Sequence, residues 1–219
     1  MEVKLSPSIL GANFLRLEDT ILKLKENDIK YLHIDIMDGH FVPNIAFGID
    51  QIKMIKQIAN DMELDVHLMV TNPEIFIDAL VEAGADTITI HQEASAHIYN
   101  LIYIIKSFGI KVGIALNPAT PINTLKHISH MVNKILIMTV EPGFGGQSFI
   151  EPMMEKISEV RSFIKSENLE CELQVDGGVN LENINKIIKN GATDIVIGSA
   201  IFKEEDISST IKKFKQAIL

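Results

Sequence analysis

The sequence predicts a single-domain α/β fold, the (β/α)8 TIM barrel. Eight short β-rich runs alternate with amphipathic stretches along the 219 residues, at about 27 residues per unit. No linker or low-complexity segment divides the chain, so we expect one domain over residues 1–219. An open, doubly wound sheet is the structural alternative. No G-x-G-x-x-G motif follows the first strand, which disfavours a dinucleotide-binding domain.

The predicted elements follow one another in strict alternation. The strands cover residues 3–9, 31–37, 64–70, 86–91, 111–116, 134–140, 171–176 and 193–198, and helical periodicity is clearest over 15–27, 73–83, 98–108 and 183–190. Pro73 suits a first helical turn, and Gly84, Gly109 and Gly191 each stand where a helix should end. This order predicts a parallel sheet with right-handed crossovers, with the chemistry at the C-terminal ends of its strands.

The amino-acid composition limits the kinds of partner and the cellular location that we expect. The chain is 47% hydrophobic, has a net charge of -9 and contains only two arginines, Arg16 and Arg161, so nucleic acid is not an expected partner. Its one cysteine, Cys171, fits a reducing compartment and is interpreted as a small buried hydrophobe. We find no secretory signal and no apolar run of the ~20 residues that span a membrane. We therefore expect a soluble, cytoplasmic protein.

Four residues with metal-binding side chains fall near predicted strand ends. His33 and Asp35 lie two apart and share one face of their strand, His67 lies in the next strand, and Asp176 ends the seventh. Alone, each has an ordinary explanation: a hydrogen-bonded core histidine or a turn aspartate. Their convergence on one barrel rim favours a shared divalent-metal site.

Three glycine-rich segments also follow strands. They are "EPGFGGQ" (141–147), "DGG" (176–178) and "GSA" (198–200). Barrels commonly bind phosphate with the loops after strands seven and eight, and glycine lets backbone N–H groups approach the anion. No lysine or arginine occurs in these segments, so we expect amides and Ser199, not a salt bridge, to hold a phosphate. The alternative interpretation is that these glycines only form the turns between strands and helices.

Other residues near the strand ends allow two interpretations. Met37, Met69 and Met138 fill the core or form an apolar wall over the site. The Ser8 hydroxyl is expected to form a hydrogen bond either with a substrate hydroxyl or with a turn amide. His91 is interpreted as structural, and Asp38, within "MDGH", as a turn residue or an outer partner of a metal-bound histidine.

Seven segments together resemble the ribulose-phosphate 3-epimerase family along nearly the whole chain. They are "SPSILGANF", "HIDIMDGHFVPN", "DVHLMV", "NPATP", "MTVEPGFGGQSFI", "QVDGG" and "IGSAIF". The resemblance implies a TIM barrel of the ribulose-phosphate-binding type. It also implies an isomerase that interconverts D-ribulose 5-phosphate and D-xylulose 5-phosphate in the pentose phosphate pathway. One divalent metal ion per subunit is implied, Zn²⁺ or Fe²⁺, with Mn²⁺ or Co²⁺ as alternatives, as is a homo-oligomer, a dimer or a hexamer.

The same resemblance assigns roles to residues. The metal ligands would be His33, Asp35, His67 and Asp176, and Asp35 and Asp176 would also be the catalytic acid and base. Ser8, His67 and Asp176 would contact the substrate. Its phosphate end would bind Gly143, Phe144, Gly145, Gly146, Gly177, Gly178, Gly198 and Ser199, under a cap of Met37, Met69 and Met138. Gly11, in "ILGANF", differs from the family pattern but falls outside this chemistry.

Four alternative functions have different sequence requirements. The nearest is a C3 epimerase of a six-carbon ketose phosphate such as allulose 6-phosphate. A decarboxylase of related fold needs D-x-K on strand three, where this chain has Asp65-Val66-His67. A Schiff-base aldolase needs a lysine near an upper strand end, whereas Lys111 and Lys134 open their strands. A non-catalytic sugar-phosphate binder would not need two opposed carboxylates.

Overall fold

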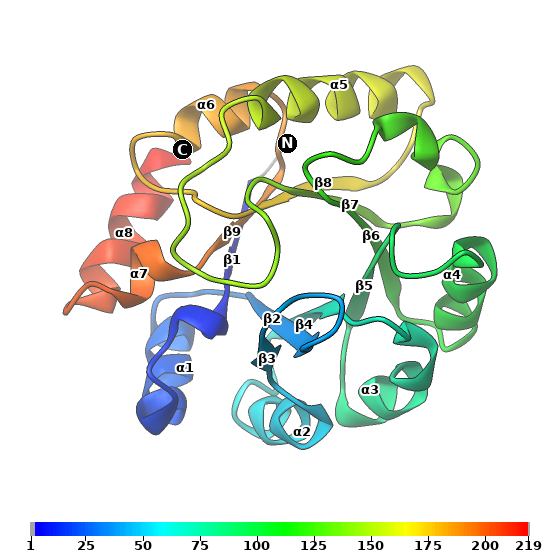
Figure 1. Cartoon of the computed structure of the whole chain (residues 1–219). Coiled ribbons are helices and arrows are strands. Elements are labelled where there is room, and N and C mark those ends of the chain that lie inside the picture. The colour runs from blue at the N-terminus through cyan, green and yellow to red at the C-terminus, as the bar shows by residue number, and fades with distance from the viewer. Residues whose placement is uncertain (1–2, 219) are drawn as a thin grey trace.

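Eight parallel strands curl around one axis and form a barrel (Figure 1). The structure, a computed structural model, describes residues 3–218. The strands, in their order of pairing, are β2 (Tyr31–Asp38), β4 (Glu63–Met69), β5 (Thr87–His91), β6 (Lys111–Leu116), β7 (Lys134–Met138), β8 (Glu172–Asp176), β9 (Asp194–Ile197) and β1 (Lys4–Pro7). A parallel bridge between Ser8 and His33 brings the chain after β1 back to β2. The expected (β/α)8 architecture is confirmed.

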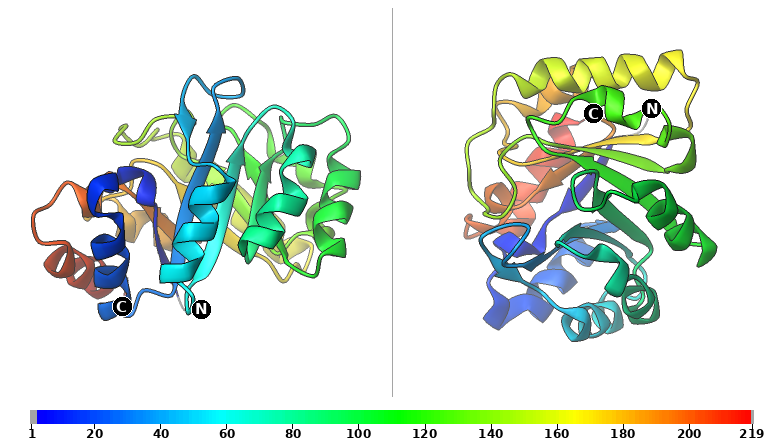
Figure 2. Two further views of the ribbon diagram at one scale, coloured as in Figure 1. Left: turned by 90° about the horizontal axis from the view of Figure 1, so that it is seen from below. Right: turned by 45° about the vertical axis from the view of Figure 1, so that its right-hand side comes forward.

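One strand was not expected from the sequence. The two-residue β3 (Ile45–Ala46) pairs antiparallel with Met37 and Asp38 at the end of β2. It turns the segment after β2 into a hairpin that projects from one end of the barrel (Figure 2, left), whereas both chain ends lie at the other end. The expected single domain includes Met1, Glu2 and Leu219, which lie outside the described residues.

Helices surround the sheet (Figure 1). They are α1 (Leu17–Glu26), α2 (Ile49–Ile58), α3 (Ile77–Ala83), α4 (Ile98–Ser107), α5 (Met153–Ser166), α6 (Ile184–Lys189), α7 (Ser199–Phe202) and α8 (Ile207–Ala217). Pro73 begins a 3-10 turn, Pro73–Ile75, and α3 begins only at Ile77. Gly84, Gly109 and Gly191 follow helices at φ angles of 98°, 76° and 112°, as their positions predicted.

The connection from β6 to β7 departs from the strand–helix pattern. Within the described residues 117–133 it contains two 3-10 turns, Ile122–Leu125 and Ser129–Met131, and no α-helix. Pro118 and Pro121 lie in this connection. Proline lacks a backbone N–H and disfavours the helical conformation in the residue before it, which accounts for the missing helix.

The two faces of each strand have different surroundings. In β2, Leu32, Ile34 and Ile36 belong to the main apolar core, which lies between the sheet and the helices. The alternate residues of the same strand, His33 and Asp35, are equally buried but face the barrel axis. The barrel interior is therefore partly polar.

An ion cluster fills the N-terminal part of that interior. The Nζ of Lys134 lies 2.8 Å from Oδ2 of Asp65 and 3.1 Å from Oδ2 of Asp194. Gln174 Nε2 donates to the same two oxygens at 2.7 and 2.8 Å, and Ser6 Oγ donates to Asp194 Oδ1 at 2.6 Å. Although burial works the other way, Asp194 and Asp65 raise the pKa of Lys134, so this lysine stays charged.

No helix among residues 3–218 has both the length and the apolar character needed to span a lipid bilayer.

We predict that Lys134→Met lowers the free energy of unfolding by about 3–5 kcal/mol, because it leaves two buried carboxylates without their cation. The matched control is Lys111→Met. Lys111 opens the neighbouring strand β6, but its ion pair with Glu63 is exposed, so its loss should cost under about 1 kcal/mol. Urea denaturation measures both, and equal costs would contradict a stabilising role for the cluster.

Candidate active site

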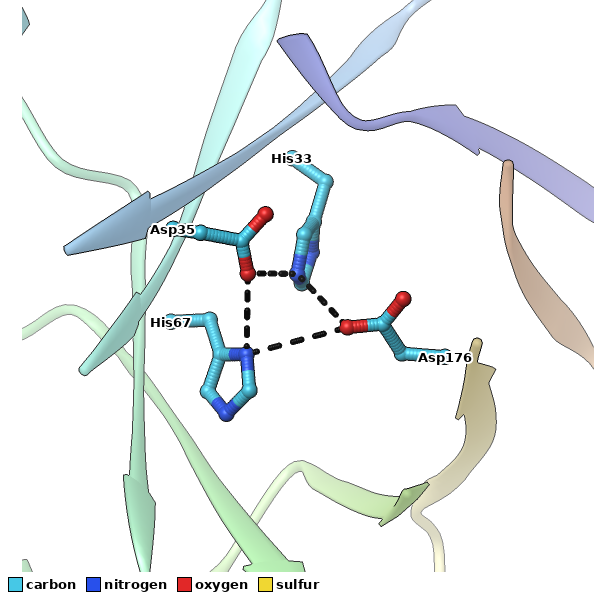
Figure 3. Close-up of side chains that lie close together, drawn as sticks. All are labelled: His33, Asp35, His67 and Asp176. Carbon is cyan, nitrogen blue, oxygen red and sulfur yellow. Dashed lines mark hydrogen bonds and ion pairs between the residues drawn. The ribbon is translucent and has the colours of Figure 1, made fainter. Parts of the chain in front are cut away.

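Four side chains converge at the C-terminal end of the barrel (Figure 3). His33 and Asp35 come from β2, His67 from β4, and Asp176 is the last residue of β8. The Nε2 of His33 lies 3.4 Å from Asp35 Oδ1 and 3.7 Å from Asp176 Oδ2. The Nδ1 of His67 lies 3.2 and 3.9 Å from the same two oxygens. The residues expected to share a site are thus adjacent.

This cluster has the geometry and the chemistry to bind a metal ion. One ligand atom from each residue lies within 4.8 Å of all the others. A tetrahedral ion bound at about 2.0–2.2 Å would separate its ligand atoms by about 3.3–3.6 Å, close to the distances observed. His33 Nε2 is buried without a hydrogen-bond partner among residues 3–218. Two imidazoles and two carboxylates suit zinc and other first-row divalent ions.

The two carboxylates of the cluster differ in their affinity for a proton. Although burial works to raise it, His33 and His67 together hold the pKa of Asp35 well below its usual range. Burial, followed by the negative charge of Asp35, raises the pKa of Asp176 to about 7. Asp35 is therefore ionised at neutral pH, while Asp176 lies close to the midpoint of its titration. A cation bound between them would favour the ionised form of both.

His33 is oriented from below by the ion cluster. Its Nδ1 lies 2.9 Å from Oδ2 of Asp65, the oxygen that also contacts Lys134. Because a carboxylate accepts hydrogen bonds, Nδ1 carries a proton, and Nε2 is the nitrogen that would present a lone pair to a bound cation. Although burial opposes it, Asp35 and then Asp65 raise the pKa of His33.

His67 is held on its outer side by His91. The Nε2 atoms of the two rings are 2.8 Å apart, and the rings stack with centroids 4.9 Å apart. Burial lowers the pKa of His91 to about 4, so this imidazole is neutral at pH 7. His91 was interpreted from the sequence as structural, and the structure places it directly behind a candidate metal ligand.

Ser8 contacts the site through Asp35. Its Oγ donates a hydrogen bond to Asp35 Oδ2 at 2.7 Å, and both side chains are buried. The sequence offered a substrate hydroxyl or a turn amide as its partner, and neither included a carboxylate on β2. The bridge between Ser8 and His33 explains the contact, because it sets the segment after β1 beside β2.

A cavity opens above the cluster. Its lining includes Ser8, Asp35, Asp176 and the three methionines of the expected cap. It also includes every residue that was expected to bind phosphate: Gly143, Phe144, Gly145, Gly146, Gly177, Gly178, Gly198 and Ser199. It also includes residues that were not expected: Leu10, Gly11, Val140, Pro142, Gln147, Val179 and Val196. His33 and His67 are fully buried and are not part of this lining.

Gly11 lines the cavity, although it was expected to lie outside the site chemistry. A Cβ at this position would lie 3.1 Å from both the backbone carbon of Gly198 and the nitrogen of Ser199. The chain after β1 thus packs closely against the third glycine-rich segment. A glycine before α1 gave no signal of this contact, because it depends on β1 and β9 being neighbours.

The glycine-rich loop after β7 folds over the end of β8. Gly178 has a φ angle of 66°, and a Cβ there would lie 2.3 Å from the backbone nitrogen of Phe149, so only glycine fits. Gln147 Nε2 donates to the carbonyls of Glu141 and Phe144 at 2.6 and 2.9 Å. Asn44 Nδ2, from the hairpin after β2, donates to the Gly143 carbonyl at 2.9 Å. Two loops therefore close over the cavity together.

Lys203 brings a positive charge to this loop. Its Nζ lies 3.2 Å from the point that a Cβ on Gly146 would occupy, and Ser199 Oγ lies 3.8 Å from the same point. The lysine lies just outside the glycine-rich segments, so the composition of those segments does not reveal it. The available signal was its spacing: residues four apart on a helix share a face, and Lys203 follows Ser199 by four.

Asp38 and Cys171 have other roles. Asp38 accepts hydrogen bonds from the backbone N–H groups of His40, Phe41 and Thr71. Although burial works the other way, these bonds lower the pKa of Asp38 to about 2, as expected for a turn residue. Cys171 is half-buried at the opposite, N-terminal end of β8, and burial raises the pKa of its thiol to about 11. It is therefore a poor thiolate nucleophile.

Comparison with protein families identifies the chain. The model of the ribulose-phosphate 3 epimerase family matches residues 4–202. The chain belongs to the ribulose-phosphate 3-epimerase family. The family resemblance of the sequence motifs is thereby confirmed.

Curated members of the ribulose-phosphate 3-epimerase family align with nearly the whole chain. The chloroplastic ribulose-5-phosphate-3-epimerase of Arabidopsis thaliana is 40% identical over 98% of this chain and 76% of its own length. The ribulose-phosphate 3-epimerase of Bacillus subtilis is 39% identical over 97% of this chain and 98% of its own. That of Methanocaldococcus jannaschii is 41% identical over 99% of this chain and 92% of its own.

Solved structures with the same architecture are more distant in sequence. The 3-hexulose-6-phosphate synthase of Salmonella typhimurium matches with a TM-score of 0.73 at 18% identity, covering 98% of each chain. KGPDC from Streptococcus mutans matches with a TM-score of 0.74 at 11% identity, over 100% of this chain and 98% of that one. At these identities the likeness concerns the fold alone.

Proposed function

We propose that the protein is a ribulose-phosphate 3-epimerase, which interconverts D-ribulose 5-phosphate and D-xylulose 5-phosphate in the pentose phosphate pathway. The observation that carries this proposal is its 39–41% identity to ribulose-phosphate 3-epimerases over nearly the whole chain. The names of these relatives favour the five-carbon substrate over allulose 6-phosphate. Neither Lys111 nor Lys134 supplies a Schiff-base amine at the cavity, because each is the first residue of its strand.

Two opposed carboxylates suit an inversion at C3. The C3 proton is acidified by the neighbouring carbonyl, and its removal leaves an enediolate. Inversion requires loss of this proton on one face and its return on the other, so two bases are expected. Asp35 and Asp176 come from β2 and β8, which are not neighbours in the sheet. Each carboxylate turns its second oxygen away from the cluster (Figure 3), and we assign these oxygens to the two proton transfers.

A divalent metal ion, Zn²⁺ or Fe²⁺, with Mn²⁺ or Co²⁺ as alternatives, would neutralise the negative charge that develops on the C2 and C3 oxygens. His33 Nε2, Asp35 Oδ1, His67 Nδ1 and Asp176 Oδ2 would hold it. Their mutual distances and the buried His33 Nε2, which has no hydrogen-bond partner among residues 3–218, support this assignment.

The remaining lining residues would bind and enclose the substrate. Backbone amides of Gly143 to Gly146, Gly177, Gly178 and Gly198, together with Ser199, would hold the phosphate. Met37, Met69 and Met138 would exclude water from the reacting carbons. Ser8 would keep the Asp35 carboxylate aligned through its hydrogen bond at 2.7 Å. The expected contact of His67 with the substrate stays a prediction.

Location and assembly follow as further proposals. We place the enzyme in the cytoplasm, since its one cysteine fits a reducing compartment. We also propose that it consists of a single domain. We propose a homo-oligomer, a dimer or a hexamer, on the family resemblance. Its acidic composition argues against nucleic acid as a partner, and we expect no membrane partner.

The reaction is tested directly with both substrates. In deuterium oxide, the purified protein should convert D-ribulose 5-phosphate to D-xylulose 5-phosphate and place deuterium at C3, with a higher kcat/KM than for allulose 6-phosphate. Chelation should abolish the conversion, and an added divalent metal should restore it. Full activity after verified metal removal would refute the metal-assisted reaction.

The two catalytic carboxylates have separate tests. We predict that Asp35→Asn and Asp176→Asn each lower kcat by at least about 10²-fold, the scale of general acid–base catalysis. Steady-state kinetics in both directions measures the loss, and metal content measured on the same samples separates lost chemistry from lost metal. Normal turnover by either variant would show that the two-base assignment is wrong.

Lys203 is predicted to attract the substrate phosphate. Lys203→Gln should raise the KM for D-ribulose 5-phosphate by up to about fivefold and leave kcat unchanged, because a partly exposed ion pair contributes about 0.2–1 kcal/mol. Lys212→Gln, an equally exposed charge change on α8, is the control. The difference between the variants should vanish in high salt. An equal KM for both at low salt would remove Lys203 from the phosphate site.

A further inference from the structure

A pair of imidazoles, those of His67 and His91, lies behind the cluster. His67 Nδ1 is turned toward Asp35 and Asp176, whereas its Nε2 lies 2.8 Å from Nε2 of His91. Both rings are completely buried. On its other side, His91 Nδ1 lies 3.2 Å from Oε2 of Glu93. The atoms thus form a continuous line from the cluster, through two imidazoles, to a carboxylate.

The proton positions along this line are determined by its two ends. A neutral imidazole has one N–H and one lone pair, and two nitrogens at hydrogen-bond distance need one of each. If His67 Nδ1 presents its lone pair to a metal, its Nε2 carries the proton and donates to His91 Nε2. His91 must then be protonated at Nδ1, where Glu93 Oε2 is placed to accept. The opposite arrangement would let His67 Nδ1 donate to Asp35 Oδ1, 3.2 Å away, but it would aim a proton at the metal position and leave Glu93 without a donor from His91.

Glu93 is itself held in place. Its Oε1 accepts from the backbone N–H of Asn117 at 2.8 Å and from the hydroxyl of Thr120, both in the connection after β6. The ring of Phe41, from the hairpin after β2, covers His91 with centroids 4.7 Å apart. Residues from two separate segments therefore keep this carboxylate and this imidazole in one geometry.

We propose that His91, backed by Glu93, is a positioning residue that fixes His67 in the Nε2–H tautomer and so presents Nδ1 as a metal ligand. The proposal rests on the metal site described under the proposed function. It assigns to His67 the same kind of support that Asp65 gives to His33 at 2.9 Å, with an imidazole inserted between histidine and carboxylate. Such outer partners orient a ligand and raise its basicity.

The test measures Zn²⁺ affinity, independently of turnover, by competition with a chromophoric chelator. His91→Leu removes the acceptor and should weaken zinc binding about 10–100-fold, the usual effect of losing an outer partner. His91→Gln should remain within a few-fold of wild type, since its Oε1 can take the place of His91 Nε2 as an acceptor. Thr89→Val, a volume-conserving loss of another buried polar group on β5, is the matched control.

Imidazole nitrogen NMR of the Zn²⁺-loaded wild-type protein gives a second readout that does not depend on any variant folding. It should show His67 protonated at Nε2 and His91 at Nδ1. The reverse tautomers would overturn the proposal, as would unchanged zinc affinity in a folded His91→Leu variant or equal losses in the Gln and Leu variants. If wild type binds no zinc, the metal site itself is wrong. If wild type binds zinc and His91→Leu matches it, only the role of His91 is wrong.

Discussion

The candidate site depends on the position of one imidazole, that of His33, between two carboxylates. Asp65 holds its Nδ1 from below, and Asp35 faces its Nε2 from the side of the cavity. Asp65 keeps its charge in the barrel interior because Lys134 lies 2.8 Å away. This arrangement is possible because β2 divides its residues between two faces: isoleucines pack under the helices, while His33 and Asp35 face the axis. Packing and chemistry are therefore specified by alternate residues of one strand.

The parts of the structure that follow from local pattern could be predicted, and those that follow from strand register could not. The eight parallel strands were evident from their regular alternation with helices, and His33, Asp35, His67 and Asp176 from their place at strand ends. The contact of Ser8 with Asp35 could not be predicted, because it requires the closure of the barrel. The missing helix between β6 and β7 had a local signal, its prolines, which the repeating pattern of the other units outweighed.

The glycine-rich end of the cavity shows a similar division. The three glycine-rich segments stood out in the sequence because they follow predicted strands, where glycine lets backbone N–H groups approach an anion. Gly11 and Lys203 did not stand out, since Gly11 joins the lining through its packing against Gly198, and Lys203 lies outside the lining beside Gly146. In a chain with a net charge of -9, backbone amides and one nearby lysine would attract a phosphate dianion locally against the overall charge.

The four candidate ligands come from three strands that lie far apart along the chain, β2, β4 and β8, and this spacing has a thermodynamic consequence. An ion bound to all four would join the N-terminal and C-terminal parts of the barrel and would bind the folded chain alone. By mass action, free metal at 100 times its Kd would add about 2.7 kcal/mol to the free energy of unfolding. The supply of metal would then determine how much folded protein persists at high temperature, and metal starvation would reduce the amount of enzyme as well as its turnover.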